Sequence, residues 1–239
     1  GLREGVLHRG RDQDVAGHLE EPACRHVSRL GVALDVAVLR PVGEQVLHVD
    51  APLVIEPAGH VADAHDPGPV LSEDLGGGSL NYQGPYPIYA SRMIFGEEPK
   101  SILCKMKFDP ESRVDVKADM VLYYSGDKTA FASTIYGSYF QSTYGVLGSK
   151  AYLRMGRAYA VPRDIATKIF LDKNDKIQEI TVEPADHFKL MFDDFCGEIL
   201  KGGDGKKDYE GDLLAQARIL EAARVSDAEK RIVNISEIK

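Results

Sequence analysis

The sequence lacks any apolar run approaching the roughly 20 residues that cross a bilayer, and its N-terminus shows neither a signal-peptide core nor a lipidation motif. It also has no basic surplus, because 29 Lys and Arg stand against 37 Asp and Glu, for a net charge of −8. Without that surplus the chain has little with which to neutralise phosphates. We therefore expect a cytoplasmic protein with neither a membrane nor a nucleic acid as partner.

Cysteine is scarce as well. The three residues Cys24, Cys104 and Cys196 are far apart and form no C-x-x-C pair. This spacing argues against a disulfide framework and against a zinc ribbon. We predict buried free thiols.

Residues 1–70 lack Lys, Tyr, Phe, Asn, Thr and Met, yet hold six of the seven His. Such a composition predicts an irregular segment that is not a native domain, although the alternating Val and Leu residues at 32–38 and 46–49 would suit two strands. The histidines leave a metal site as an alternative, since several potential ligands lie close in sequence: His48, Asp50, His60, Asp63, His65 and Asp66. Their spacing matches no standard site, so we predict loop histidines and no metal.

From residue 71 onward the sequence is consistent with one folded domain, residues 71–239. The glycine triplet Gly76-Gly77-Gly78 leads to an amphipathic helix over 88–95, with Pro87 in its first turn and Gly96 at its end. A glycine turn of this kind either packs closely against backbone or cradles a phosphate. No Lys-Ser/Thr follows it, so close packing is the favoured interpretation.

Alternating apolar residues then predict a series of short strands, with Asn174-Asp175 as a hairpin turn. Two helices follow, one capped by Asp186 and ended by Gly202-Gly203, and a last strand closes the chain. The fold class is therefore α+β, a mainly antiparallel open β-sheet with helices packed on one face. The predicted strands are 101–108, 114–124, 129–139, 144–147, 151–155, 157–161, 168–171, 176–182 and 232–235, and the two helices are 188–199 and 213–223.

The order of these motifs resembles the C-terminal domain of Gfo/Idh/MocA oxidoreductases. The resemblance rests on the glycine triplet, the Tyr86-Pro87 helix, Phe95-Gly96-Glu97-Glu98-Pro99, the multistrand sheet, and the helices that begin at Asp186-His187-Phe188 and contain the run 213–222. Within that family, the run from Phe140 to Arg157-Ala158-Tyr159 is most similar to sugar-nucleotide 3-ketoreductases. Dihydrodiol and xylose dehydrogenases are the neighbouring alternatives.

The resemblance implies hydride transfer between NAD or NADP and a carbon of a sugar or sugar-nucleotide substrate. Tyr86 matches the position of the family's Tyr or His proton donor, which in relatives acts with a Lys of an E-K-P motif. Tyr82 stands where relatives carry an Asp, and a phenol is no carboxylate base, so ordinary catalysis is in question. Asn81, Tyr82, Arg157 and His187 are the predicted substrate-binding residues.

Residues 1–70 contain no G-x-G-x-x-G, no E-K-P motif and no Lys, so the chain offers no family-type cofactor-binding residues. We therefore predict a substrate-binding domain without its dinucleotide-binding Rossmann domain, inactive alone. The alternative is a non-catalytic oligomerisation or carbohydrate-binding module, a homo-oligomer through the sheet face. The aromatic residues Tyr123, Tyr124, Phe131, Tyr136, Tyr139, Phe140 and Tyr144 suit an interface or a sugar platform.

Overall fold

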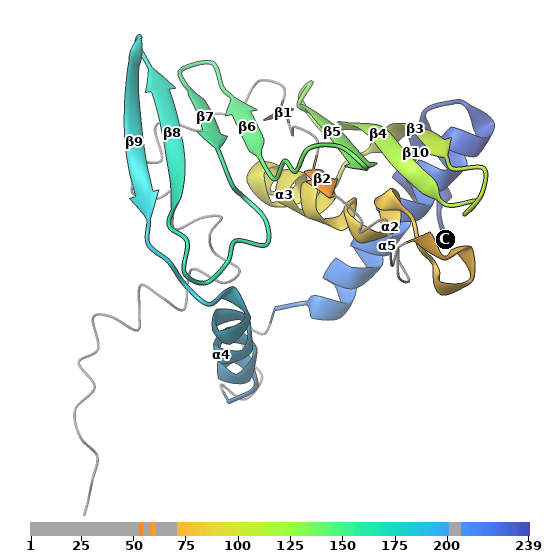
Figure 1. Cartoon of the computed structure of the whole chain (residues 1–239). Coiled ribbons are helices and arrows are strands. Elements are labelled where there is room, and N and C mark those ends of the chain that lie inside the picture. Colours follow the sequence, from red (N-terminus) through yellow and green to blue (C-terminus); the bar gives the residue numbers. More distant parts are fainter. Residues whose placement is uncertain (1–52, 55–57, 61–70, 201–206) are drawn as a thin grey trace, which may run out of the picture.

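The structure is a computed structural model that describes residues 53–54, 58–60, 71–200 and 207–239. One twisted sheet lies above a layer of helices, as Figure 1 shows. The strand order is β10-β3-β4-β5-β1-β6-β7-β8-β9, with β2 also paired to β5. Most neighbouring strands are antiparallel, which confirms the predicted α+β class.

The right-hand half of the sheet in Figure 1 is built from long meandering strands. β3 (Ser101–Phe108) pairs with β4 (Asp115–Tyr123), and β4 pairs with β5 (Thr129–Tyr136), both antiparallel. The short β10 (Val233–Asn234) pairs with β3 at the outer edge. Successive strands joined by tight turns are what the sequence pattern predicted here.

The other half continues as a second meander. Its four strands are β6 (Tyr144–Leu147), β7 (Tyr152–Met155), β8 (Thr167–Lys173) and β9 (Lys176–Val182). Asn174 and Asp175 both have positive φ between β8 and β9, the conformation of a two-residue hairpin turn. The predicted turn is therefore confirmed.

Two short strands from the N-terminal part join the halves. β1 (Leu53–Val54) lies parallel to β5 and antiparallel to β6, and β2 (Ala58–His60) lies parallel to β5. The expectation that residues 1–70 are irregular is therefore wrong for these five residues, whose backbone fills the gap between the meanders. The rest of that segment, including the possible strands at 32–38 and 46–49, lies outside the described residues, as do the side chains of the proposed histidine cluster.

Three helices cover one face of the sheet. α2 (Ser79–Tyr82) and α3 (Pro85–Phe95) pack beneath β4 and β5, and α5 (Tyr209–Glu229) packs beneath β3. α4 (His187–Leu200) stands below the opposite half of the sheet (Figure 1). Single-turn 3-10 helices at Glu73–Leu75 and Ile235–Glu237 complete the described elements.

The core lies between this sheet face and the helices. Alternate residues of the strands point into it, so that Met120, Leu122 and Ile169 are buried while their sequence neighbours are not. Ile88 of α3 and Ile219 of α5 are fully buried against them. The period-two pattern in the sequence therefore identified the inward face.

Several predicted boundaries are wrong for identifiable reasons. β5 ends at Tyr136 instead of 139 because Gly137 has φ of 75°. Residues 157–161 form a loop instead of a strand, since Ala160 has φ of 48° and Pro162 follows. The turn after the glycine triplet contains the four-residue helix α2.

The cysteine prediction is partly confirmed. Cys104 is a buried free thiol, and burial raises its pKa to about 12. Cys196 is also free but exposed, because it lies on the outer side of α4, so its predicted burial is wrong. Cys24 lies outside the described residues.

None of the helices in the described part of the chain has the length and apolarity that a bilayer crossing demands.

Candidate functional site

The candidate site begins with a buried carboxylate beneath the glycine triplet. Asp115 of β4 accepts hydrogen bonds from Ser79 Oγ and Leu80 N, both at 2.7 Å, at the start of α2. Gly78 has φ of 114°, and a Cβ there would overlap the Asp115 carboxylate, so only glycine fits. The third glycine therefore serves close packing, as predicted.

The same carboxylate argues against phosphate binding at this turn. An anion-binding glycine turn needs backbone N–H groups free to meet the phosphate, but here the N–H of Leu80 already donates to Asp115. A second anion would also be repelled by Asp115. The described residues of the turn therefore do not fit the pyrophosphate of NAD or NADP.

The corner between α2 and α3 is fixed from two sides. Gln83 Oε1 accepts from the backbone N of Ile135 in β5 at 3.1 Å. From α5, Gln216 Nε2 donates to the carbonyl of Pro85 at 3.3 Å, and Gln216 Oε1 accepts from Arg92 at 3.1 Å. These bonds hold the backbone immediately before Tyr86.

Tyr86 is the second residue of α3, and 47% of its surface is exposed. Its ring lies 5.4 Å from that of Tyr159, which in turn lies 6.1 Å from the buried Tyr144. A half-exposed phenol on a wall of aromatic rings has an apolar body and a polar tip, which suits a sugar ring and its hydroxyl groups.

A loop held by hydrogen bonds places Tyr159 next to Tyr86. The backbone N of Tyr159 donates to Ser142 Oγ at 2.9 Å, and that hydroxyl donates to the Tyr159 carbonyl at 2.9 Å. Thr167 Oγ1 donates to the carbonyl of Arg157 at 2.8 Å. The loop is therefore tied to the segment before β6 and to the first residue of β8.

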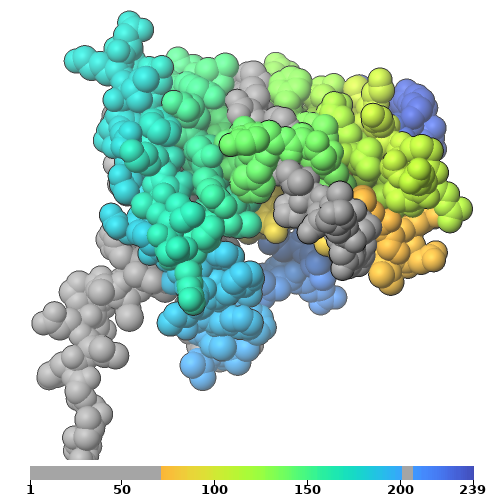
Figure 2. All heavy atoms as spheres, in the orientation of Figure 1, coloured from red at the N-terminus to blue at the C-terminus, as the bar shows by residue number. Residues whose placement is uncertain are grey.

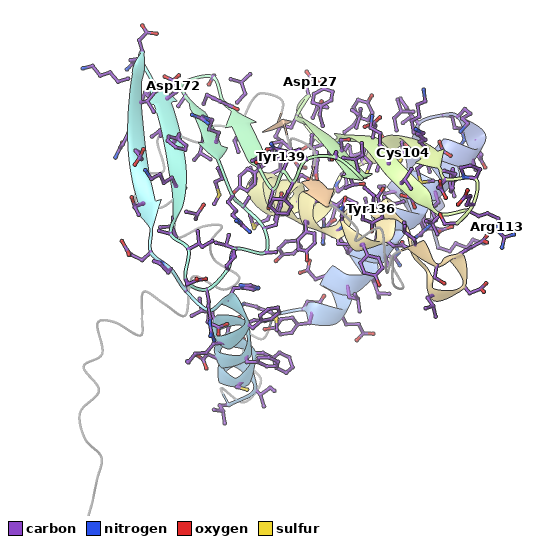
Figure 3. The ribbon with its side chains drawn as sticks, viewed as in Figure 1. Cys104, Arg113, Asp127, Tyr136, Tyr139 and Asp172 are labelled. Atoms are coloured by element: carbon purple, nitrogen blue, oxygen red, sulfur yellow. The ribbon has the colours of Figure 1, made fainter. Side chains whose placement is uncertain are left out.

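Arg157 lies two residues before Tyr159 in this loop. Its guanidinium lies over the Phe140 ring at 5.3 Å, and its buried Nε has no hydrogen-bond partner. Tyr139 is 84% exposed beside them, and Figure 3 shows it projecting from the connection between β5 and β6. The structure therefore places Arg157 in the loop that carries Tyr159 to Tyr86, and its substrate-binding role stays a prediction.

The other predicted substrate-binding residues have different surroundings. Tyr82 is 44% exposed, one turn before Tyr86. Asn81 Nδ2 donates to the Gly76 carbonyl at 2.8 Å, and Asn81 Oδ1 accepts from Arg224 of α5, so this side chain closes the glycine turn. His187 begins α4, with its ring 4.2 Å from Phe188, and is not brought into contact with Tyr86.

The predicted aromatic platform is divided. Tyr124, Tyr136 and Tyr144 are buried on the helix side, whereas Phe131 is exposed on the open sheet face. Tyr136, labelled in Figure 3, donates to the Gly78 carbonyl at 3.2 Å, and burial raises the pKa of its phenol. No single aromatic surface is formed, because alternate strand residues point to opposite faces.

Sequence reasoning gave no role to Asp115, Gln216, Ser142 or Tyr159 in the site. Only Tyr159 carried a local signal, as part of the run Arg157-Ala158-Tyr159. The other three act through contacts between segments far apart in sequence. Among the residues that the structure describes, no three His, Cys, Asp or Glu side chains gather as a metal site.

The fold and site together are a mainly antiparallel open sheet with a tyrosine, Tyr86, at the start of the helix α3 that packs beneath it. Residues 57–154 match the family model of the GFO/IDH/MocA C-terminal domain. The recognition made from the sequence motifs is thereby confirmed.

Among curated relatives, a dTDP-3,4-didehydro-2,6-dideoxy-alpha-D-glucose 3-reductase of Actinomadura kijaniata is 23% identical over 63% of this chain and 45% of its own. An oxidoreductase of Rhizobium meliloti is 26% identical over 57% of this chain and 43% of its own. The chain thus spans less than half the length of these relatives.

Solved structures show the same fold. A 3-ketoreductase from Actinomadura kijaniata, in complex with NADP and TDP-benzene, superposes with a TM-score of 0.71 at 19% identity, over 82% of this chain and 61% of that one. An aldose-aldose oxidoreductase from Caulobacter crescentus complexed with glycerol gives 0.68 at 23% identity, over 87% and 62%.

Proposed function

We propose that this chain is the substrate-binding domain of an NAD(P)-dependent oxidoreductase that acts on a sugar or sugar nucleotide. The observation that carries the proposal is Tyr86, half-exposed at the start of α3 with its ring in tilted contact with that of Tyr159. The relatives that reduce dTDP-sugars, and the solved one that holds TDP-benzene, support a sugar nucleotide as the substrate.

The role of Tyr86 would be to hold a proton at the substrate oxygen. Reduction of a ketone needs a proton on the oxygen as the carbon gains its hydride, and a phenol hydroxyl at that oxygen can give it. The phenol works best beside a cation, because its ordinary pKa is near 10. Among the described residues, no Lys or Arg is hydrogen-bonded to Tyr86 or stacked on its ring. The described residues therefore do not supply the cation that would assist proton transfer from this phenol.

The relatives support this pairing of residue types. The Actinomadura kijaniata 3-ketoreductase was also solved as variants in which a lysine becomes alanine and a tyrosine becomes phenylalanine. The 239 residues contain no G-x-G-x-x-G motif. At the glycine triplet, the carboxylate of Asp115 already accepts the backbone N–H that follows. We therefore propose that these residues alone bind substrate but do not turn it over.

A second candidate function is assembly through the open sheet face. The register places Leu103, Val121 and Phe131 side by side across β3, β4 and β5, and Phe131 is 43% exposed. An apolar row on an uncovered sheet is typical of a surface that pairs with another copy. We propose that two copies pair through this row, which is compatible with sugar binding on the helix side.

Calorimetric titration with a dTDP-sugar tests the first function. We expect saturable binding that Tyr86→Phe weakens by about 3- to 10-fold, the effect of one neutral hydrogen bond. Tyr152→Phe is the matched control, since Tyr152 lies on the open face of β7 and should leave the affinity unchanged. Absence of binding by the wild-type chain, with an intact fold by circular dichroism, would favour the assembly module instead.

A further inference from the structure

Arg157 lies in the loop between β7 and β8, residues 156–166, and its charge has no partner among the described residues. Its guanidinium contacts the ring of Phe140 at 5.3 Å, and its buried Nε–H meets no acceptor. In the part of the chain that the structure describes, no hydrogen bond or ion pair to this guanidinium is formed. Figure 2 shows the loop in green-cyan at the surface, beside the green segment that joins β5 and β6.

Arg92 provides the contrast within the same fold. It is buried, and its guanidinium donates to Glu98 from Nε at 2.7 Å and from Nη2 at 2.6 Å, and to Asp212 at 2.7 Å. A buried N–H without an acceptor has lost its hydrogen bond to water and gained none in return, so an arginine that serves only the fold is normally paired as Arg92 is. Arg157 is therefore a cation whose acceptor has to come from outside the described residues.

Hydrogen bonds hold the backbone at Arg157 in place. Its carbonyl accepts from Thr167 Oγ1 at 2.8 Å, and the next residue, Ala158, donates its N–H to the Ser142 carbonyl at 2.6 Å. Thr167 and Ser142 are themselves buried. The guanidinium is therefore presented from a fixed backbone, and a ligand does not have to order the loop on binding.

The chemistry of this cation suits a phosphate. An arginine that contacts an aromatic ring still binds anions, because its planar fork of N–H groups matches two oxygens of a phosphate. The glycine triplet does not offer such a site, since the N–H of Leu80 already donates to the Asp115 carboxylate. Arg157 is therefore a better phosphate contact than the glycine turn.

The position of Arg157 relative to Tyr86 indicates a phosphate on the substrate itself. Tyr159, whose ring lies 5.4 Å from that of Tyr86, comes two residues after Arg157. Two residues of extended chain span at most about 7 Å, so the backbone of Arg157 is close to that of Tyr159. A ligand whose sugar ring meets the two tyrosines can therefore extend a phosphate ester towards the guanidinium.

We propose that Arg157 binds a phosphate of the substrate while Tyr86 meets its sugar ring, so that the domain selects phosphorylated sugars over neutral ones. This role of Arg157 rests on the proposed function, because it requires a sugar at Tyr86. The phosphate comes either from a sugar phosphate or from the diphosphate of a sugar nucleotide, since both present the same oxygens to a guanidinium. Either ligand supplies the acceptor and the negative charge that the described residues do not give to Arg157.

Titrations of the full chain followed by NMR chemical shifts, which detect weak binding, test the proposal with four ligands: glucose, glucose 1-phosphate, dTDP and dTDP-glucose. Arg157→Gln should weaken binding of the three phosphorylated ligands by about 10- to 100-fold, the effect of a hydrogen bond to a charged group, and leave glucose unchanged. Arg157→Lys keeps the charge but loses the planar fork, so its affinities should lie between those of Arg157→Gln and the wild type. Added salt should weaken phosphorylated ligands in the wild type and have little effect in Arg157→Gln.

Arg154→Gln is the matched control. The guanidinium of Arg154 lies over the ring of Phe170 at 4.3 Å, so the two arginines have the same kind of aromatic neighbour. Leu153 and Met155 on either side of Arg154 are buried, which places Arg154 on the open face of β7. Its replacement should leave all four affinities unchanged, and the urea midpoints of both variants show whether the fold is intact.

The outcomes separate this role of Arg157 from the proposed function. Equal affinities of the wild type and Arg157→Gln for the phosphorylated ligands would overturn the role of Arg157, and glucose binding that Tyr86→Phe weakens would leave the proposed function standing. Binding of dTDP that depends on Arg157, with no gain from the sugar of dTDP-glucose and no binding of glucose, would support the phosphate contact and contradict the proposed function. A folded wild type that binds none of the four ligands would overturn both.

The same series identifies the source of the phosphate. Tighter binding of dTDP-glucose than of glucose 1-phosphate, lost in Arg157→Gln, would support a sugar nucleotide. Equal affinities for these two ligands, both lost in Arg157→Gln, would support a sugar phosphate.

Discussion

Asp115 links three segments through one carboxylate. It is buried beneath α2, and both of its hydrogen bonds, to Ser79 Oγ and to Leu80 N, involve the same oxygen. Thr134 of β5 donates to the same Ser79 hydroxyl at 3.2 Å. A single side chain of β4 therefore fixes the start of the corner that carries Tyr86.

Two substitutions of Asp115 test whether it stabilises the fold through its hydrogen bonds or only through the burial of its side chain. Asp115→Ala leaves the Leu80 N–H and the Ser79 hydroxyl without their acceptor, so the free energy of unfolding should fall by about 2 kcal/mol. Asp115→Asn keeps one acceptor oxygen and should cost about 1 kcal/mol or less. Urea denaturation followed by circular dichroism checks both values, and equal losses in the two variants would contradict the bonding described.

At the scale of elements, the C-terminal turn fastens β10 and α5 to the sheet. Glu237 in the last 3-10 helix accepts from Asn234 N at 2.8 Å and from Arg231 Nη2 at 2.8 Å, and these bonds lower its pKa to about 2. The neighbouring Ile235 N donates to the Lys100 carbonyl at 2.9 Å. The final turn thus closes against the segment that precedes β3.

This depressed pKa predicts how stability depends on pH. Glu237 has an ordinary pKa of 4.5 when unfolded and about 2 when folded, so its contribution is present above about pH 4.5 and is lost as the pH falls towards 2. Glu237→Gln should lower the urea midpoint at neutral pH, and the difference from wild type should shrink at low pH. If the difference in urea midpoint between Glu237→Gln and the wild type does not change with pH, the negative charge of Glu237 does not contribute to stability.

At the scale of the whole molecule, the described residues present the surface around Tyr86 on the helix side, an open sheet face and the exposed apolar side chains of α4. Asp115 closes the glycine turn, because the backbone N–H of Leu80 already donates to its carboxylate. The chain also spans less than half the length of its curated relatives. We expect hydride chemistry to require residues beyond these.

Titration with NADPH, followed by its fluorescence, tests that expectation. We expect no saturable change with the 239-residue chain, and no oxidation of NADPH when a sugar nucleotide is added. Binding of the dTDP-sugar in the same sample would show that the domain is folded and competent. Tight NADPH binding would instead place a cofactor site in residues that the sequence motifs do not reveal.

Much of the fold could be predicted from local patterns. Alternation located β3, β6 and β9 to the residue, and helical spacing located α4 and the middle of α5. The loop at 157–161 was mistaken for a strand because Tyr159 and Val161 fit the alternation. Only the left-handed conformation of Ala160 and the bonds to Ser142 turn that segment into a loop.

For the candidate site, Tyr86 and Arg157 could be proposed from motif order, but their surroundings could not. Tyr159 reaches Tyr86 only because the loop is tied to Ser142, more than a dozen residues earlier in the sequence. The apolar spacing of α4 was evident as well, yet it indicates a buried face as readily as an exposed one.

The sequence by itself determined the inward side of most strands, the helix over 88–95 and the resemblance to the family, because these depend on short-range periodicity and on motif order. The tertiary structure alone decided that β1 and β2 pair with β5, that Asp115 fills the glycine turn, and that the apolar side chains of α4 are exposed. Contacts between distant segments depend on how whole elements pack, and no local pattern of residues specifies that packing.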